Sequence, residues 1–175
     1  MMERLIFVRT SLVALLFAIP AVVMLPRASH SLAVPALAFV WCLFFEYLYH
    51  RWFQHRPGTI FADKHHLHHA TYRRENEKEH LNFGGHPIYV ALLFVVNGAP
   101  LVAVDLIFHT RWFPPAMLIF VGYVIVMEDI HYRIHTGLWV PFNLGVKHHH
   151  GHHTMPPKNF NVFIPLFDYL LGTKE

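Results

Sequence analysis

Four apolar stretches limit what this chain can fold into. A membrane-spanning helix needs about 20 apolar residues, and the stretches at 32–53, 88–108 and 112–130 reach that length, whereas the one at 10–25 is shorter and contains Pro20. Charged residues make up only 14% of the 175 residues, against ~25% in soluble domains. We therefore expect an all-α integral membrane protein with four transmembrane helices, forming a single membrane domain over 1–175.

The N-terminus allows a second interpretation. Arg4 and Arg9, an apolar run and then Ser31-Leu32-Ala33 are similar to a secretory signal peptide with its cleavage site. Because the next apolar stretch follows Ala33 directly, a tight helical hairpin is the simpler interpretation. Which of the two applies is left open by the sequence.

The basic residues predict an orientation. If all four stretches span, one side holds residues 1–9, 54–87 and 131–175, and with Arg51 at the membrane rim it has twelve of the fourteen Lys and Arg residues. Only Arg27 and Arg111 lie opposite. The positive-inside rule makes the richer side cytoplasmic. In a membrane chain this basic excess indicates cytoplasmic loops, so we expect no nucleic-acid partner.

Seventeen histidines are the second anomaly of the composition, and their clusters follow the same topology. Histidines lie at the ends of the second and fourth stretches. A dense histidine cluster at 65–69 follows the second stretch, and another at 148–153 follows the fourth. Two intervening spans return the chain to the side that it left. All four clusters are therefore expected in a cytoplasmic helical cap, on one face of the membrane, as a shared metal site would require.

Helix geometry aligns most of these side chains. In His65-x2-His68-His69 the second and third imidazoles fall about 60° and 40° either side of the first, because each residue advances about 100°. The motif at 149–153 repeats this spacing, and His131 and His135 are one turn apart. His50 and His55 lie about 140° apart on a regular helix, so they converge only if the helix bulges or ends between them.

Neutral imidazole is a common ligand of iron, copper and zinc, and ten imidazoles suit two metals with about five each. The predicted metal-binding and catalytic residues are His50, His55, His65, His68, His69, His131, His135, His149, His152 and His153. His66 and His148 are ambiguous neighbours, and His30, His80 and His109 are expected at the membrane rim. Glu46 and Asp129 could orient ligating histidines or pair with a rim arginine.

Four other features of the sequence have simpler interpretations. The single cysteine, Cys42, excludes disulfides, zinc ribbons and iron–sulfur clusters within one chain. Residues 71–80 are expected to be a solvated charged stretch, and Pro156-Pro157 marks a turn. Residues 160–171 are too short to span, so we expect them to pack on the site or to lie in the interface.

The ordered motifs resemble the fatty acid hydroxylase / sterol desaturase superfamily. The resemblance runs from about Phe39 to Thr173 and comprises His50-x4-His55, His65-x2-His68-His69, Gly85-His86-Pro87-Ile88, His131-x3-His135, His149-x2-His152-His153, Asn159-Phe160 and Phe163-x4-Asp168-Tyr169-Leu170-Leu171-Gly172-Thr173. The chain departs from the family at Tyr89, where glutamate is frequent, and at Leu166, where tryptophan is frequent. These departures leave the histidine pattern intact and weaken any assignment of the substrate.

The resemblance implies a non-haem site with two iron ions, or zinc in their place, in histidine boxes at 50–69 and 131–153. It also implies O2 as co-substrate, electrons from a separate donor such as cytochrome b5 or a ferredoxin, and a hydroxylated or desaturated lipid product from a fatty acyl chain, sterol or carotenoid. The membrane would be the endoplasmic reticulum in a eukaryote or the inner membrane in a bacterium. The apolar tail of the substrate would meet Phe160, Phe163, Phe167 and Tyr169, although core packing explains these aromatics equally well.

Other functions fit fewer features. A membrane metal-binding or metal-transport protein without redox chemistry needs polar groups inside the spans, and Asn97 and Asp105 are among the few available. A haem protein would need only paired axial histidines, and its Soret band would identify it. A metal-containing isomerase or hydrolase on the same scaffold is a further alternative.

Overall fold

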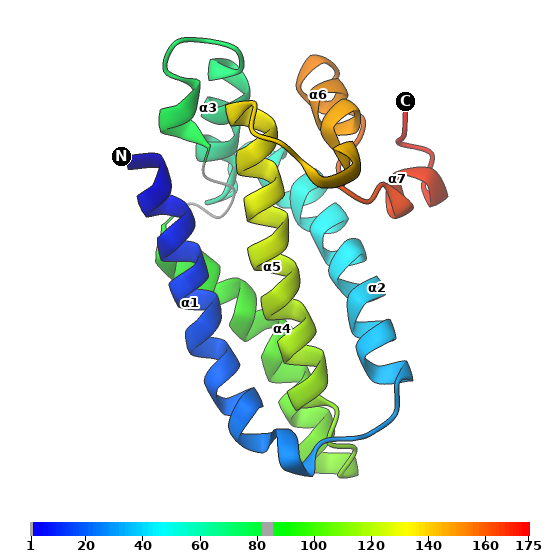
Figure 1. Cartoon of the computed structure of the whole chain (residues 1–175). Coiled ribbons are helices and arrows are strands. Elements are labelled where there is room, and N and C mark those ends of the chain that lie inside the picture. Colours follow the sequence, from blue (N-terminus) through cyan, green and yellow to red (C-terminus); the bar gives the residue numbers. More distant parts are fainter. Residues whose placement is uncertain (1, 82–85) are drawn as a thin grey trace. The chain divides into compact units, whose positions relative to one another are not determined.

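The computed structural model describes residues 2–81 and 86–175, with side chains from Val8 onward, and these ranges contain helices and no strand. Gly85 of the predicted His-Pro element lies outside them. The α-helices are α1 (Met2–Met24), α2 (Ala33–Leu48), α3 (Ala62–Thr71), α4 (Pro87–Phe108), α5 (Phe113–Thr136), α6 (Val146–Thr154) and α7 (Leu166–Leu170) (Figure 1). Between them lie the 3₁₀ turns η1 (Leu25–Arg27), η3 (Glu77–His80) and η4 (Pro141–Asn143) and the π-helix η2 (Tyr49–Gln54).

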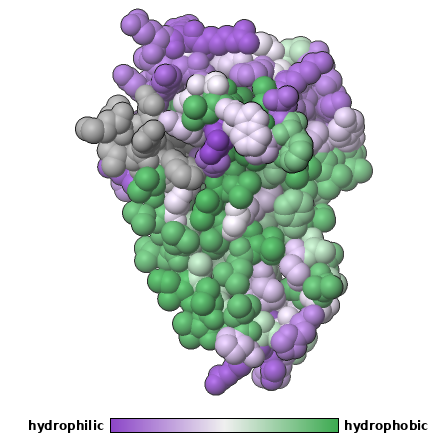
Figure 2. Space-filling view, in the orientation of Figure 1, coloured by the Kyte–Doolittle hydropathy of each residue, from purple (hydrophilic) through white to green (hydrophobic). Residues whose placement is uncertain are grey.

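Four helical segments are long and apolar enough to cross a membrane: Val8–Arg27, Ala33–Gln54, Pro87–Phe108 and Phe113–Thr136. Each of the four predicted spans is therefore a helix of suitable length and composition. Large apolar side chains point outward from them, among them Val23 (74% exposed) and Leu106 (72% exposed), and Figure 2 shows hydrophobic residues covering the visible face of the long helices. Lipid is the medium in which such a surface is stable, so the chain is an integral membrane protein.

The chain divides into two compact units, which we describe separately. The apolar unit comprises residues 8–42 and 86–125. In its core Phe94 packs against Phe17 and Phe120, with ring centroids 5.0 Å apart in both pairs. A Cβ atom added at Gly98 would come within 2.5 Å of the Met117 side chain. Glycine therefore lets α4 and α5 approach closely at this point.

Two polar side chains of the apolar unit, Asn97 and Asp105, have hydrogen-bond partners within it. The indole of Trp41 donates to Asn97 Oδ1 at 2.8 Å. The Asp105 carboxylate accepts from the backbone N–H groups of Trp112 (2.7 Å) and Phe113 (2.8 Å) and from the Thr110 hydroxyl. A carboxylate at a helix N-terminus satisfies free N–H groups and the helix dipole. Asn97 and Asp105 thus serve packing and capping.

The histidine unit comprises residues 1–7, 43–85 and 126–175, described within the limits given above. It contains the short helices α3, α6 and α7 together with η2, η3 and the end of α5. α6 begins after Gly145, which has a φ of +71° and faces the Val162 carbonyl so closely that a Cβ would lie 2.3 Å from it. Only glycine fits there. Asn161 and Val162 are fully buried, so the first part of the segment at 160–171 packs inside this unit, which is one of its two predicted positions. Its last residues, Tyr169, Leu170 and Leu171, are exposed.

Candidate metal centre

Nine of the ten predicted histidines form two groups, in each of which one ring nitrogen per residue, able to bind a metal, lies within 4.8 Å of the others. The five-histidine group contains His50, His55, His65, His69 and His152, and the four-histidine group contains His68, His131, His135 and His149. The tenth, His153, adjoins the second group, with its Nε2 3.2 Å from Nε2 of His149. The structure therefore brings all ten predicted side chains together.

The π-helix η2 brings His50 and His55 to the same side of the helix, although they are five residues apart. The backbone N–H of His55 donates to the carbonyl of His50, five residues earlier, at 3.2 Å. This wider turn places residues five apart one above the other, and the two imidazole rings lie 5.1 Å apart. Of the two predicted alternatives, a bulge or a helix end between the two residues, the structure shows the bulge.

Each three-histidine motif contributes to both groups. On α3, His65 and His69 join the five-histidine group, whereas His68 joins the four-histidine group. On α6 the division is reversed, because His152 belongs to the five-histidine group and His149 to the other. The arc of imidazoles predicted for each helix therefore straddles two sites. The sites adjoin, since the rings of His69 and His153 lie 4.4 Å apart.

The Nε2 atoms converge at distances that fit shared cations. In the five-histidine group His65 Nε2 lies 3.0 Å from His50 Nε2 and 2.9 Å from His55 Nε2. In the four-histidine group His135 and His149 are 2.9 Å apart at the same atom. Two nitrogens bound at right angles to one metal at ~2.1 Å would lie roughly 3.0 Å apart. Because each neutral Nε2 offers either one proton or one lone pair, a shared metal explains such convergence better than hydrogen bonding.

Burial keeps these imidazoles neutral. It lowers the pKa of His65, His149 and His152 well below the usual 6.5, and neighbouring imidazoles lower it further. For the same reasons the pKa of His55 falls to about 4 and that of His69 to about 2. Neutral imidazole is the ligand form, so the metal-free site is already in the protonation state that binds a cation.

The far side of several rings is held by a hydrogen-bond acceptor. Nδ1 of His50 donates to the Phe160 carbonyl, and Nδ1 of His152 donates to the Lys158 carbonyl at 2.7 Å. Nδ1 of His135 donates to Oε1 of Glu77 at 2.6 Å. An acceptor at Nδ1 fixes the tautomer in which Nε2 has the lone pair that a metal could bind.

The sequence had suggested other carboxylates for this role. Glu46 accepts from Asn161 Nδ2 and from the backbone N–H of Val162, both at 2.9 Å, so it holds the loop beside Phe160. Asp129 pairs with Arg133 at 2.6 Å, which is the rim pair named as its alternative. Glu77 comes from the stretch that we expected to be solvated, and that expectation is wrong for this residue.

The two ambiguous histidines lie outside the two groups, and the aromatic Phe160 lies against one of them. His66 is exposed, and Nε2 of His148 lies 3.0 Å from Oδ2 of Asp168, so neither belongs to the two groups. Of the four aromatics proposed to meet the substrate, Phe160 lies against the imidazoles, with its ring 5.6 Å from His55 and 5.8 Å from His152. Tyr169 is 61% exposed.

Comparison with known proteins agrees with this geometry. No curated protein and no solved structure matched the chain. The family model described as fatty acid hydroxylase matches residues 35–173, a range that contains all ten clustered histidines. The histidine groups suit a metal site, and the members of this family are typically metal-dependent. The chain therefore belongs to the fatty acid hydroxylase family.

Proposed function

We propose that this protein is a membrane-bound non-haem di-iron oxygenase that hydroxylates or desaturates a lipid such as a fatty acyl chain, sterol or carotenoid. Membership of the fatty acid hydroxylase family supports an O2-dependent oxidation. The observation that supports it most is the pair of adjoining histidine groups with converging Nε2 atoms. Together they offer nitrogen ligands for two cations, and zinc could replace iron in the same positions.

The chain itself binds, orients and shields. Its five-histidine group and its four-histidine group, with His153 adjoining the latter, would each hold one cation. Bound iron supplies the redox chemistry with O2 that breaks an unactivated C–H bond, for which side-chain acids and bases are insufficient. Phe160 covers the five-histidine group, and the Tyr72 ring stacks on His153 at 4.3 Å. These aromatic rings limit water at the site and offer an apolar surface to a hydrocarbon substrate.

The electrons come from a separate donor such as cytochrome b5 or a ferredoxin. The excess of Lys and Arg residues on the histidine side favours a cytoplasmic site, where such soluble or membrane-anchored donors are available. The corresponding membrane is the endoplasmic reticulum in a eukaryote and the inner membrane in a bacterium.

The experiment compares membranes from cells that express the wild type, His152→Ala or His30→Ala. His152 belongs to the five-histidine group, whereas His30 is an exposed histidine of the apolar unit. Lipids are profiled by mass spectrometry after growth with ¹⁸O2 and without O2. We expect an O2-dependent product in the wild type and in His30→Ala and its loss in His152→Ala, with ¹⁸O in the product if it is hydroxylated.

The oxygenase proposal fails if the wild type forms no O2-dependent lipid product beyond that of His152→Ala. Two bound metals without such a product would favour the alternative of a metal-binding or metal-transport protein. The apolar unit gives transport little support, because Asn97 and Asp105 have packing and capping partners.

A further inference from the structure

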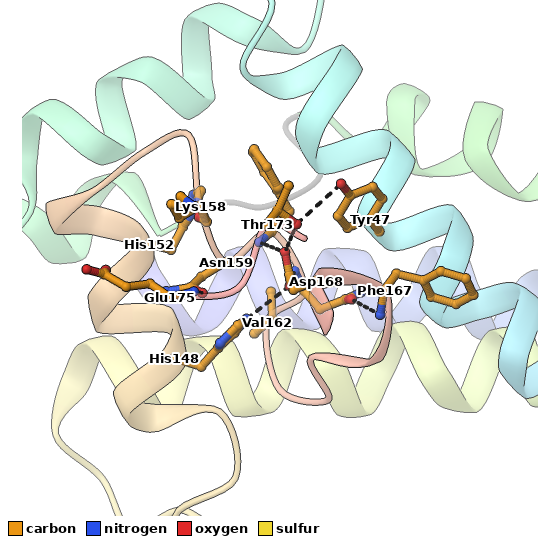
Figure 3. A network of polar contacts seen from close by, with 12 residues as sticks. Tyr47, His148, His152, Lys158, Asn159, Val162, Phe167, Asp168, Thr173 and Glu175 are labelled. Carbon is orange, nitrogen blue, oxygen red and sulfur yellow. Dashed lines mark hydrogen bonds and ion pairs between the residues drawn. The ribbon is translucent and has the colours of Figure 1, made fainter. Parts of the chain in front are cut away.

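A buried carboxylate outside both histidine groups organises the C-terminal segment. Asp168 is fully buried. Its Oδ1 accepts from the backbone N–H of Phe160 and from the Thr173 hydroxyl, both at 2.8 Å. Its Oδ2 accepts from the backbone N–H of Asn161 at 2.7 Å and faces His148 Nε2 at 3.0 Å. Figure 3 shows Asp168 between His148 and Thr173.

These bonds keep a buried charge stable. Burial alone would raise the pKa of Asp168, but hydrogen bonds from His148, Asn161, Thr173 and Phe160 hold it below its usual value. A carboxylate with four donors is a firm anchor, because leaving any of these buried donors unpaired costs free energy.

The anchored segment orients two imidazoles of the five-histidine group. Its Phe160 carbonyl accepts from Nδ1 of His50, and its Lys158 carbonyl accepts from Nδ1 of His152. Between them Asn159 has a left-handed backbone, with φ +60°, and its N–H donates to the Thr173 carbonyl at 2.9 Å. Asp168 and Thr173 together therefore fix residues 158–161.

We propose that Asp168 is a positioning residue for the metal of the five-histidine group, acting through the carbonyls of Lys158 and Phe160 that hold His152 and His50. The inference rests on the proposed two-metal centre and adds how one of its halves is oriented. In the four-histidine group the acceptor at His135 is Glu77, which belongs to η3. Loss of Asp168 should therefore weaken metal binding at the five-histidine group, and loss of Glu77 should weaken metal binding at the four-histidine group.

The test is a Co²⁺ titration of the full chain in detergent after chelator treatment, followed by calorimetry and by visible Co²⁺ absorption. We expect two binding steps in the wild type. Asp168→Asn should weaken one step by ~10–100-fold, the usual effect of losing a group that orients a metal ligand, and change its absorption band. The other step should stay within about twofold. Glu77→Gln should weaken the complementary step.

Asp105→Asn is the matched control, because Asp105 also accepts three hydrogen bonds but caps α5 in the apolar unit. It should lower the melting temperature and leave both Co²⁺ steps unchanged. If Asp168→Asn does not fold, Thr173→Val removes one donor to Asp168 Oδ1 and should weaken the same step by a smaller factor.

The outcomes distinguish a failure of the two-metal centre from a failure of the positioning role of Asp168. A wild type that takes up fewer than two Co²⁺ ions contradicts the proposed two-metal centre itself. A wild type with two ions and an Asp168→Asn variant with unchanged steps overturns the positioning role. Equal weakening of both steps by Asp168→Asn and Thr173→Val would also overturn it, since that pattern indicates a general loss of structure.

Discussion

The two histidine groups share the motifs of α3 and α6 but are oriented by different parts of the chain. In the five-histidine group the main-chain carbonyls of Lys158 and Phe160 receive the outer N–H groups of two rings. In the four-histidine group the Glu77 carboxylate receives that of His135. A carbonyl orients a ring without adding charge, whereas a carboxylate also makes the imidazole a more basic ligand. Two sites with the same type of ligand therefore have different electrostatics.

The largest expected effect is the loss of a ligand from either group. His152→Ala should remove the metal of the five-histidine group, and His149→Ala that of the other, because each side chain is buried among the other histidines of its group. Lipid product should fall more than about 100-fold in both variants, since even groups that only orient ligands contribute 10–100-fold. Mass spectrometry of lipids measures this fall. Near-normal product from either variant would show that one group is dispensable.

The second-largest effect is expected from the substitution of Glu77. Glu77→Gln keeps the shape and removes the charge that His135 faces, so iron bound at the four-histidine group should exchange with a chelator about 10–100 times more readily. Competition with a chromophoric chelator measures the change. Glu79→Gln, at an exposed position of the same 3₁₀ turn, is the control and should resemble the wild type. Equal effects of the two variants would contradict the electrostatic difference that we infer between the two histidine groups.

Acid should destabilise the metal-free protein through the five-histidine group. Above pH 6.5 His55 is neutral in both the folded and the unfolded chain. Between about pH 6.5 and 4 the unfolded chain binds a proton that the folded chain excludes, because the folded pKa is about 4. Stability therefore falls as the pH drops through this window.

Thermal unfolding after chelation measures this dependence. The melting temperature should be lower at pH 5 than at pH 8 by at least ~5 °C, and His55→Gln should have a shallower dependence. A melting temperature that does not vary with pH would contradict the neutral, buried state of these imidazoles.

The smallest effect is expected for His66→Ala. His66 lies beside three ligand candidates in the sequence, but its side chain is exposed and its Nε2 lies 3.4 Å from the His55 carbonyl. Exposed substitutions usually change stability by no more than ~0.5 kcal/mol. Metal content should be unchanged and lipid product should stay within about twofold. Loss of one metal would instead make His66 a ligand.

The positions of the candidate spans and the clustering of the histidines were predictable, because both depend on local spacing in the sequence. Apolar length alone located the four candidate spans to within about two residues at each end, except that the fourth continues to Thr136 and was predicted to end at residue 130. The five-residue interval between His50 and His55 required a bulge or a helix end, and η2 is the bulge. The division of each motif between two groups was not predictable, because a helical wheel gives the width of an arc but not which side meets which partner.

Contacts between distant segments were also beyond local patterns. Glu77 and His135 are 58 positions apart, and no periodicity links them. Asp168 lay within a recognised element, yet its bonds to Phe160 and Asn161 depend on how residues 158–161 pack. The sequence therefore indicated the candidate ligands better than the groups that orient them.

The ratio of iron to protein tests the central claim most directly. The full chain is purified in detergent, loaded with Fe²⁺ without oxygen, freed of loose metal and analysed by plasma mass spectrometry. The two histidine groups predict two iron atoms per wild-type chain and about one in His152→Ala or His149→Ala. A wild-type ratio of one or zero would contradict a two-metal centre.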